Sequence, residues 1–340
     1  MHDDISWQRA HVRALRDLTP SVREFELVPE TGVRNWTPGS HLRVRVPLAQ
    51  VGEVSHEMRH EVRHETRHYS LIGLPAESSS RGAYRIAVKR LEPGRGGSRY
   101  LWSLAEGAEL AIGEPANHFE LSPTAPQYLL VAGGIGVTPL VAMARTLAAR
   151  GAALRMCYSA RSAQELAYRD ELADALGASL AVYTGESGER IDLDAEIAGL
   201  APGGQLYVCG PIVLLDAARE AWERSGRAIG DLRFETFGNT GRHAAVPFWV
   251  ELVDRGRRIE VPADRSLLDV LEDAGIAALS DCRRGECGLC ALRVVRTDGI
   301  VDHRDVFLSA RQKAANERFC TCVSRVSGGG IVLDSAYRPE

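Results

Sequence analysis

Five of the seven cysteines lie close together near the C-terminal end of the chain, between Cys282 and Cys322. Three of them have C-x4-C-x2-C spacing in the segment DCRRGECGLC: Cys282, Cys287 and Cys290. This spacing is typical of a plant-type [2Fe–2S] loop, which needs a fourth thiolate further along the chain. Gly285 and Gly288 suit such a loop, because side chains would obstruct a backbone that wraps around a cluster. Structural zinc sites usually pair their cysteines in two separated C-x2-4-C knuckles, so the spacing favours a cluster over zinc.

The charge balance argues against nucleic acid as a partner. The 340 residues carry 41 Lys and Arg against 45 Asp and Glu, a formal net charge of −4, whereas binding a phosphate backbone needs a basic excess. The longest uncharged stretch, residues 121–144, is interrupted by proline, glycine and polar residues and predicts no membrane crossing. The N-terminal segment MHDDISWQRA has neither the basic nor the apolar region of a secretory signal, so we expect a cytoplasmic protein.

Three hydrophobic patterns follow one another and predict a multidomain protein. Short alternating runs such as AYRIAVKRL predict an antiparallel β-barrel over residues 1–122. Residues 123–240 alternate apolar strands with helical runs, as in an α/β domain with a parallel sheet. A candidate linker follows at residues 238–247, where Gly, Asn and Pro gather. Two strands, a helix with a capping box at Ser266 and the cysteine loop then outline an α+β β-grasp ferredoxin unit over residues 241–340.

The β domain carries two motifs suited to a flavin. They are RHYSL, with Arg67, Tyr69 and Ser70, and GRGGS, with Gly96, Gly97 and Ser98. Arginine offers a bidentate fork to a phosphate, tyrosine offers a flat face to an isoalloxazine ring, and serine and glycine amides are further donors. Because the two motifs precede a nucleotide domain, their combination predicts a flavin site.

Two glycine turns in the α/β domain predict a nucleotide site. They are VAGGIGVTPL, with Gly133, Gly134, Gly136, Thr138 and Pro139, and VCGP, with Cys209, Gly210 and Pro211. Both follow parallel strands, and ligands of open α/β sheets bind at the C-terminal ends of such strands. The first turn is not the full Rossmann fingerprint, because the strand after it ends near Arg161 and not in an acidic residue. Since Arg161 is suited to a 2′-phosphate, NADPH stays open beside NADH.

One local repeat, HEMRHEVRHETRH, places four histidines at intervals of four residues: His56, His60, His64 and His68. On a helix these imidazoles would share one face and could bind Zn or Ni. We expect instead a solvated loop between two strands, where extra length is tolerated.

In their order, the four motifs resemble those of the phthalate dioxygenase reductase and vanillate demethylase reductase family, within the ferredoxin reductase superfamily. The resemblance covers nearly the whole chain. It implies that Arg67, Tyr69 and Ser70 bind FMN and that Gly96, Gly97 and Ser98 lie near the flavin phosphate. It also implies that the aromatic residue of FETFGN covers the flavin, which we assign to Phe237 with Phe234 as the alternative.

The resemblance further implies that the GGIGVTP turn binds the nicotinamide nucleotide and that Cys209, with Gly210 and Pro211, lies beside the nicotinamide. Two arguments disagree about the fourth cluster ligand. An interval of 29 residues after Cys290, as in plant ferredoxins, selects Cys320. The phrase CVSR resembles the ligand-bearing ending of bacterial oxygenase reductases and selects Cys322, which we prefer because a loop insertion is easier to accommodate than a shifted strand.

These features predict an NADH-dependent reductase that passes electrons through FMN and a [2Fe–2S] cluster to a separate terminal oxygenase. The family suggests a Rieske non-haem iron oxygenase or demethylase acting on an aromatic compound, in a transient complex. The alternatives are a reductase for a cytochrome P450 or another acceptor, a zinc-stabilised nucleotide-sensing protein, and a flavin reductase that releases reduced flavin. We expect Cys209 and Phe237 to orient the reacting rings.

Overall fold

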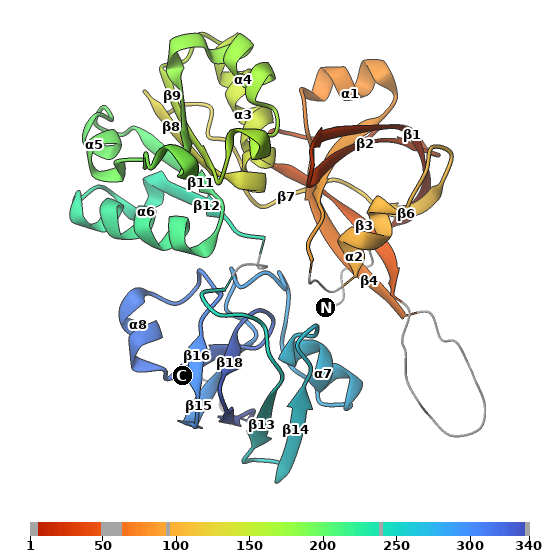
Figure 1. The fold of residues 1–340 in the computed structure, drawn as a ribbon, viewed down its shortest axis with the longest axis vertical. Helices are drawn as coiled ribbons and strands as arrows, with labels where there is room; N and C mark the ends of the chain where they lie inside the picture. The colour runs from red at the N-terminus through yellow and green to blue at the C-terminus, as the bar shows by residue number, and fades with distance from the viewer. Residues whose placement is uncertain (1–5, 49–62, 93–95, 238–240, 337–340) are drawn as a thin grey trace. The chain divides into compact units, whose positions relative to one another are not determined.

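The computed structural model describes residues 6–48, 63–92, 96–237 and 241–336 (Figure 1). They form two compact units. The first comprises Met1–Cys209 and Ala221–Phe234, and the second comprises Gly210–Glu220 and Glu235–Glu340. Among the described helices, none has both the length and the apolar character needed to cross a membrane. The predicted domain boundaries at residues 122 and 240 stay predictions, because α6 and β12 contribute residues to both units.

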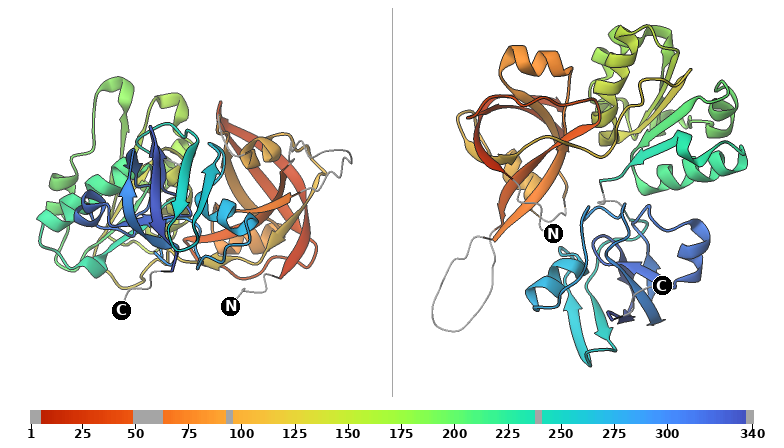
Figure 2. Two further views of the ribbon diagram at one scale, coloured as in Figure 1. Left: turned by 90° about the horizontal axis from the view of Figure 1, so that it is seen from below. Right: turned by 180° about the vertical axis from the view of Figure 1, so that it is seen from behind.

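An antiparallel barrel forms the N-terminal part of the first unit. Its elements are β1 (Trp7–Thr19), β2 (Val22–Pro29), β3 (Ser40–Leu48), β4 (Arg63–Ser70), α1 (Pro75–Arg81), β5 (Tyr84–Lys89), α2 (Gly97–Trp102), β6 (Glu109–Gly113) and β7 (Ala116–Asn117). The strands pair in the order β4-β3-β6-β1-β2-β5, and β7 pairs with β3. A bridge between Leu71 and Ile86 joins the two ends of this order, so the sheet closes, as the views in Figure 2 show.

The barrel closes around apolar side chains because its strands alternate inward and outward positions. On β2, Phe25 and Leu27 are buried within the barrel core. On β3, Leu42, Val44 and Val46 occupy every second position and are fully buried. This confirms the predicted antiparallel barrel.

A parallel sheet forms the rest of the first unit, with the order β10-β9-β8-β11-β12. Its elements are β8 (Tyr128–Gly133), η1 (Gly134–Gly136), α3 (Val137–Ala149), β9 (Leu154–Ala160), η2 (Ala163–Glu165), α4 (Arg169–Leu176), η3 (Gly177–Ser179), β10 (Leu180–Thr184), η4 (Gly185–Ser187), α5 (Leu193–Ala198), β11 (Gln205–Cys209), α6 (Ile212–Arg224), η5 (Ile229–Asp231) and β12 (Leu232–Glu235). Every residue of β8 is buried, as expected of a central parallel strand with helices on both faces. In Figure 1, α3 and α4 lie on one side of this sheet, and α5 on the other.

The second unit has the predicted β-grasp outline. Its elements are β13 (Phe248–Leu252), β14 (Arg257–Val261), α7 (Leu267–Asp273), β15 (Ala291–Thr297), β16 (Ile300–Asp302), α8 (Ala310–Ala315), β17 (Arg318–Cys320), β18 (Arg325–Ser327) and β19 (Gly330–Asp334). The five-stranded sheet has the order β14-β13-β19-β15-β17, and β16 pairs with β18. The predicted capping box starts α7: the Ser266 hydroxyl accepts the Asp269 N–H at 3.1 Å, and the Asp269 carboxylate accepts the Ser266 N–H at 3.3 Å.

The candidate linker is partly held in place. Residues 238–240 lie outside the described residues, but the N–H of Arg242 donates to the Asp302 carboxylate at 3.0 Å. The N–H of His243 donates to the same carboxylate at 3.4 Å. A buried carboxylate of the second unit therefore fixes this segment.

Candidate electron-transfer sites

The cysteine loop between α7 and β15 adopts the wrapped conformation that the glycine pattern predicts. Arg283, Gly285 and Gly288 all have φ in the left-handed region, at 51°, 78° and 74°. A Cβ on Gly285 would lie 2.7 Å from the Val323 side chain and 2.8 Å from the Asp305 Cα atom. Glycine is therefore needed at position 285 for two reasons, the backbone conformation and the close approach.

The loop also directs backbone amides at a cysteine sulfur. The Cys282 Sγ atom accepts N–H groups from Arg284 at 3.4 Å, Glu286 at 3.3 Å and Cys287 at 3.4 Å. Burial raises the pKa of the Cys282 thiol, and these three amides act in the opposite direction because they favour the thiolate. Such N–H donors are what a cluster thiolate requires.

The Sγ atoms of Cys290 and Cys322 lie 3.2 Å apart. Cys320 ends β17, whereas Cys322 lies in the turn that follows, so the two candidate ligands do not share a strand. Hydrogen bonds from the thiols of Cys320 and Cys322 lower the pKa of Cys290, so both sulfurs lie near it.

Two further contacts separate the candidate cysteines. The pKa of Cys322 is raised mainly by its hydrogen bond to Cys290 and by burial; Cys282 also acts on it, and the Gly285 N–H donates to its sulfur. The pKa of Cys320 is raised by Cys290, by burial and by the buried carboxylate of Asp305. Both cysteines therefore contact Cys290, but Cys322 also interacts with Cys282 and Gly285 of the cysteine loop, whereas Cys320 interacts with the carboxylate of Asp305.

The four predicted thiols fit a two-iron cluster better than a single ion. They form two pairs, Cys282 with Cys287 and Cys290 with Cys322. Within the described ranges, no group of three or more His, Cys, Asp or Glu side chains is arranged around one ion position. All seven cysteines are free thiols.

The structure brings the two predicted flavin motifs together in the first unit. A Cβ on Gly97, the first residue of α2, would lie 2.9 Å from the Arg67 Nε atom, so the Arg67 side chain crosses this glycine. Gly96 precedes α2 with φ of 85°, and the Ser98 hydroxyl accepts the Leu91 N–H at 3.2 Å. The guanidinium of Arg67 also pairs with Glu65, a neighbour that sequence reasoning missed.

Tyr69 and Ser70 end β4 with different surroundings. Tyr69 packs against the barrel core and lies opposite Leu42, and burial raises its pKa to about 12. Ser70 is buried at 4% exposure, and its Oγ atom has no hydrogen-bond partner among the described residues. An unpartnered buried hydroxyl at the end of β4, the strand that also carries Arg67 and Tyr69, suits a polar ligand, so these residues fit the flavin that the motifs predict.

The described part of the histidine repeat belongs to a strand. His56 and His60 lie outside the described residues, but His64 and His68 are part of β4. Four residues along a strand span about 13 Å, so the helical stacking of these two imidazoles is wrong. His68 instead stacks on His41, with ring centroids 4.8 Å apart.

The nucleotide turns lie at adjacent strand ends. Gly133 ends β8, Gly134 has φ of 53°, and the pairing of Cys209 with Ala132 places the ends of β8 and β11 side by side. Since β9 lies on the other side of β8, this is the position where the strand order reverses and where such sheets bind ligands.

The structure shows where the residues predicted in these two turns lie. Helix α3 begins at Val137, so Pro139 lies in its first turn and does not open it. The Thr138 hydroxyl donates to the Ile135 carbonyl at 3.0 Å. Gly210 and Pro211 follow β11 and precede α6, as predicted, and Cys209 is fully buried. Arg161 follows β9 and is exposed.

Phe234 lies on β12 in the first unit, and Phe237 follows β12 in the second unit. Both side chains are half-buried. The barrel belongs to the first unit, so the flavin-covering role of Phe237 stays a prediction.

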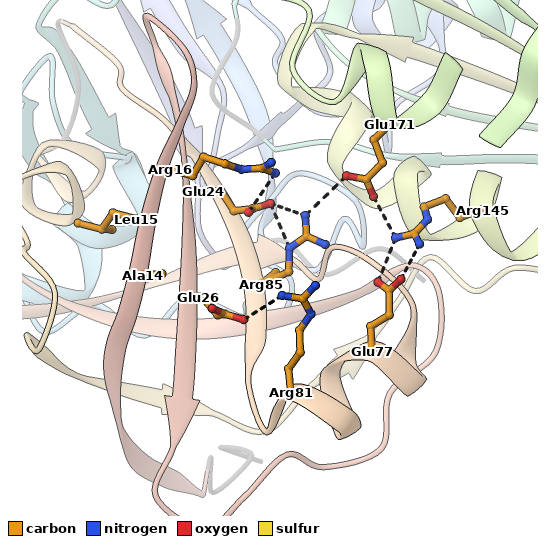
Figure 3. A pocket seen from close by; sticks show the side chains of 10 residues that line it. All are labelled: Ala14, Leu15, Arg16, Glu24, Glu26, Glu77, Arg81, Arg85, Arg145 and Glu171. Carbon is orange, nitrogen blue, oxygen red and sulfur yellow. Dashed lines mark hydrogen bonds and ion pairs between the residues drawn. The ribbon is translucent and has the colours of Figure 1, made fainter. Parts of the chain in front are cut away.

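A charged cavity of about 480 Å³ in the first unit holds none of the predicted residues (Figure 3). Glu24 accepts Arg85 at 2.7 Å and the buried Tyr168 hydroxyl at 2.8 Å. Arg145 of α3 bridges Glu77 at 2.5 Å and Glu171 at 2.9 Å. These pairs connect the barrel strands and α1 with α3 and α4. The cavity therefore lies at a seam, by which we mean the contact between the barrel and the parallel sheet of the first unit. Sequence reasoning missed it because the partners lie far apart along the chain.

Comparisons with known proteins agree with these sites. Residues 130–220 match the oxidoreductase NAD-binding domain, and residues 250–327 match the 2Fe-2S iron-sulfur cluster binding domain. The chain is 37% identical over 327 residues to the heme-dependent oxidative N-demethylase beta subunit of Ectopseudomonas mendocina (strain ymp), covering 95% of this chain and 97% of that protein.

Two solved structures are also similar. Phthalate dioxygenase reductase, described as a modular structure for electron transfer from pyridine nucleotides to [2Fe-2S], shares 32% identity at a TM-score of 0.71, with 97% of this chain and 98% of that chain covered. An intact type IV self-sufficient cytochrome P450 monooxygenase shares 36% identity at a TM-score of 0.62. That match covers 96% of this chain but 41% of the P450 chain, so this chain spans less than half of that protein.

Proposed function

The chain belongs to the phthalate dioxygenase reductase family of oxygenase reductase subunits, and from this premise we propose how its own residues hold the redox groups and which acceptor it serves. It is an oxidoreductase with an NAD-binding domain and a [2Fe–2S] domain. When bound, the nicotinamide donates a hydride, the flavin accepts its two electrons, and the cluster passes them on singly.

The observation that carries the proposal is the arrangement of the second-unit thiols. Cys282 and Cys287 hold one iron of the cluster, and Cys290 and Cys322 hold the other. The 3.2 Å separation of the Cys290 and Cys322 sulfurs supports the second pair. The three amides on the Cys282 sulfur stabilise its thiolate form and fix its orientation.

In the first unit, Arg67 and the amides of Gly96 and Gly97 hold the phosphate of FMN. The contact between the Arg67 side chain and Gly97 supports this assignment. Tyr69 contacts the isoalloxazine ring, and the buried Ser70 hydroxyl forms a hydrogen bond to its polar edge. Ser98 lies beside these residues, and its hydroxyl accepts the Leu91 N–H, which steadies the start of α2 and leaves the O–H free to donate.

The nicotinamide nucleotide binds across the ends of β8 and β11. The turn formed by Gly133, Gly134 and Gly136, at the start of η1 and α3, would hold its phosphates. Thr138 and Pro139 shape the first turn of α3, and Cys209 with Gly210 and Pro211 borders the nicotinamide. We assign NADH as the donor, in agreement with the family, and Arg161 as the residue whose exposed position would admit a 2′-phosphate.

The acceptor is a separate terminal oxygenase, and we propose a Rieske non-haem iron oxygenase or demethylase of aromatic compounds, met in a transient complex. Phthalate dioxygenase reductase, at 32% identity over nearly the full chain, supports this assignment. A haem protein is the second candidate acceptor, because one relative is a subunit of a heme-dependent demethylase and one similar structure is a P450. Seven free thiols and a nicotinamide donor suit a cytoplasmic location.

Analysis of the purified holoprotein tests the assignment. We expect one FMN, two iron atoms and two acid-labile sulfides per chain, and visible bands of both groups that bleach when NADH is added without oxygen. Zinc without sulfide would contradict the cluster, and flavin bleaching in a protein that lacks iron would favour a flavin reductase. Reduction of purified Rieske and haem oxygenases by the NADH-reduced protein then distinguishes the two acceptors.

A further inference from the structure

A buried row of three charges lies beside the cysteine loop of the second unit. Glu235, at the end of β12, is 2% exposed. Its Oε1 atom accepts Arg284 Nη1 at 2.9 Å. The other side of the same guanidinium pairs with the Glu286 Oε2 atom, also at 2.9 Å. Two carboxylates thus share one arginine within the cysteine loop.

The row ties the segment after β12 to this loop. The Oε1 atom of Glu286 accepts the N–H of Thr236 at 3.1 Å, and Thr236 is itself 2% exposed. Glu235 is therefore held through its side chain, and Thr236 through its backbone. Both partners belong to the loop between Cys282 and Cys287.

The same two loop residues also contact the sulfur of Cys282, a proposed cluster ligand, through their backbone amides. The N–H groups of Arg284 and Glu286 donate to the Cys282 Sγ atom. Their side chains hold Glu235 and Thr236 while their amides hold the sulfur. A change at Glu235 is thereby transmitted to Cys282 through residues that contact both.

When Glu235 is ionised, the row carries a net negative charge, and its Glu235 and Arg284 side chains are buried. One arginine cannot compensate two carboxylates, and the Oε2 atom of Glu235 has no hydrogen-bond partner among the described residues. Burial raises the pKa of Glu235 to about 7; Arg284 lowers this pKa and Glu286 raises it. Buried ions contribute little net stability compared with apolar residues of the same volume. A contribution to fold stability therefore does not explain why these three charges are placed together.

We propose that Glu235 is a positioning residue for the iron–sulfur cluster: through Arg284 it fixes the amides on the Cys282 sulfur, and its charge keeps the reduction potential of the cluster low. The inference rests on the proposed function, since it needs the cluster in this loop. Reduction adds one negative charge to the cluster, so a nearby carboxylate opposes it. The N–H groups that donate to the Cys282 sulfur favour reduction of the cluster, and their positions depend on how Arg284 is held.

The test is a redox titration of the holoprotein, with the cluster followed by electron paramagnetic resonance. Glu235→Gln keeps the shape and the acceptor oxygen but removes the charge. We expect it to retain iron and sulfide and to have a more positive midpoint potential than the parent protein. Glu235→Asp, which keeps the charge, should restore most of the parent value.

Asp302→Asn is the matched control. Asp302 is also buried, pairs with Arg304 at 2.8 Å, and holds the amides of Arg242 and His243. Among the described residues, its side-chain hydrogen bonds go to Arg242, His243 and Arg304, and none of these residues belongs to the cysteine loop. We expect its replacement to lower thermal stability and to leave the cluster potential at the parent value.

An unchanged potential in Glu235→Gln, or an equal shift in Asp302→Asn, would overturn the proposal. If Glu235→Gln does not load the cluster, the potential of Glu286→Gln decides, and a parent value in that variant would have the same meaning. Failure of the proposed function looks different, because the parent protein would then contain no iron and sulfide.

Discussion

At the residue scale, the choice between Cys320 and Cys322 decides how the cluster is closed. Cys322 interacts with Cys282, Cys290 and the Gly285 amide, whereas Cys320 is completely buried at the end of β17 beside Asp305. A ligand must face the loop that supplies the other thiolates. The contacts therefore support Cys322.

Serine replacements test this assignment. We expect Cys322→Ser to lose most of its iron and acid-labile sulfide while keeping its flavin, because one of four thiolates is gone. Cys320→Ser should keep both near parent levels. Iron and sulfide analysis of the two purified variants measures the difference, and the reverse pattern would assign the fourth ligand to Cys320.

Glu235 predicts a pH dependence of the cluster potential. Its pKa is raised by burial to about 7, with Arg284 and Glu286 as the charged groups that act on it. Below this pKa the carboxyl is neutral and the potential is at its upper limit. As the pH rises through about 7, Glu235 becomes negative and the potential falls, because a negative charge opposes reduction.

Potentiometric titration between about pH 5.5 and about pH 8.5 measures this dependence, because this range covers both protonation states of a carboxyl with a pKa of about 7. The parent protein should show a decrease that levels off above neutrality, and Glu235→Gln should lack most of it. An equal slope in both proteins would assign the dependence to another group.

At the element scale, the start of α2 links the two flavin motifs. Gly97 has room for Arg67 only because it lacks a Cβ atom, which would lie 2.9 Å from Arg67 Nε. An alanine there displaces a flexible side chain and leaves the backbone in place. The consequence should therefore concern the ligand of Arg67 more than the fold.

We expect Gly97→Ala to weaken FMN binding by about tenfold, which corresponds to about 1.4 kcal/mol and to the loss of part of one charge-assisted contact. Fluorescence titration of the flavin-free protein with FMN measures the dissociation constant. Gly230→Ala is the control, because a Cβ at Gly230 meets no atom within 4 Å. Unchanged affinity in Gly97→Ala would place the phosphate away from Arg67.

Helices and strands whose formation depends on residues close together in the sequence were predictable. The strand at β9 and the capping box of α7 depend on neighbouring residues, and both were found as predicted. The start of α3 was misplaced by two residues, because the tight η1 turn runs directly into the helix. The histidine repeat was assigned to a loop, but the pairing of β4 with β3 extends the strand through His64.

Site features that depend on distant contacts were beyond the sequence. The motifs predicted candidate flavin and cluster residues because their spacing reflects local loop geometry, and these assignments stay predictions. The pairing of Glu235 with Arg284 joins residues 49 positions apart, and no local sequence pattern predicts this pairing. The seam around Arg145 has the same origin, since Glu77 is 68 positions away.

At the scale of the whole molecule, the first unit depends on the seam between its barrel and its parallel sheet. Arg145 lies between Glu77 and Glu171, so its removal takes away the ion pair of Glu77 and leaves Glu171 with the longer contact to Arg85, at 3.6 Å (Figure 3). The pKa of Glu77 is lowered by Arg145, against the effect of burial. The arginine thus stabilises the charged form of its partner.

We expect Arg145→Met to destabilise the first unit by about 1 to 3 kcal/mol, a range below that of fully buried pairs because these side chains are partly exposed. The flavin fluorescence of the holoprotein during heating reports the transition. Arg9→Met is the control, since the Arg9–Glu30 pair is mostly exposed and should contribute little. Equal shifts in the two variants would refute a special role for the seam.

The central claim is that one chain carries NADH-derived electrons through a flavin to a cluster. The measurement that tests it most directly is an anaerobic titration of the holoprotein with NADH, followed by visible absorption and electron paramagnetic resonance. A two-electron flavin and a one-electron cluster together accept three electrons, so full reduction should need about 1.5 equivalents of NADH per chain. An end point near one equivalent, with the cluster still oxidised, would contradict electron transfer to the cluster within this protein.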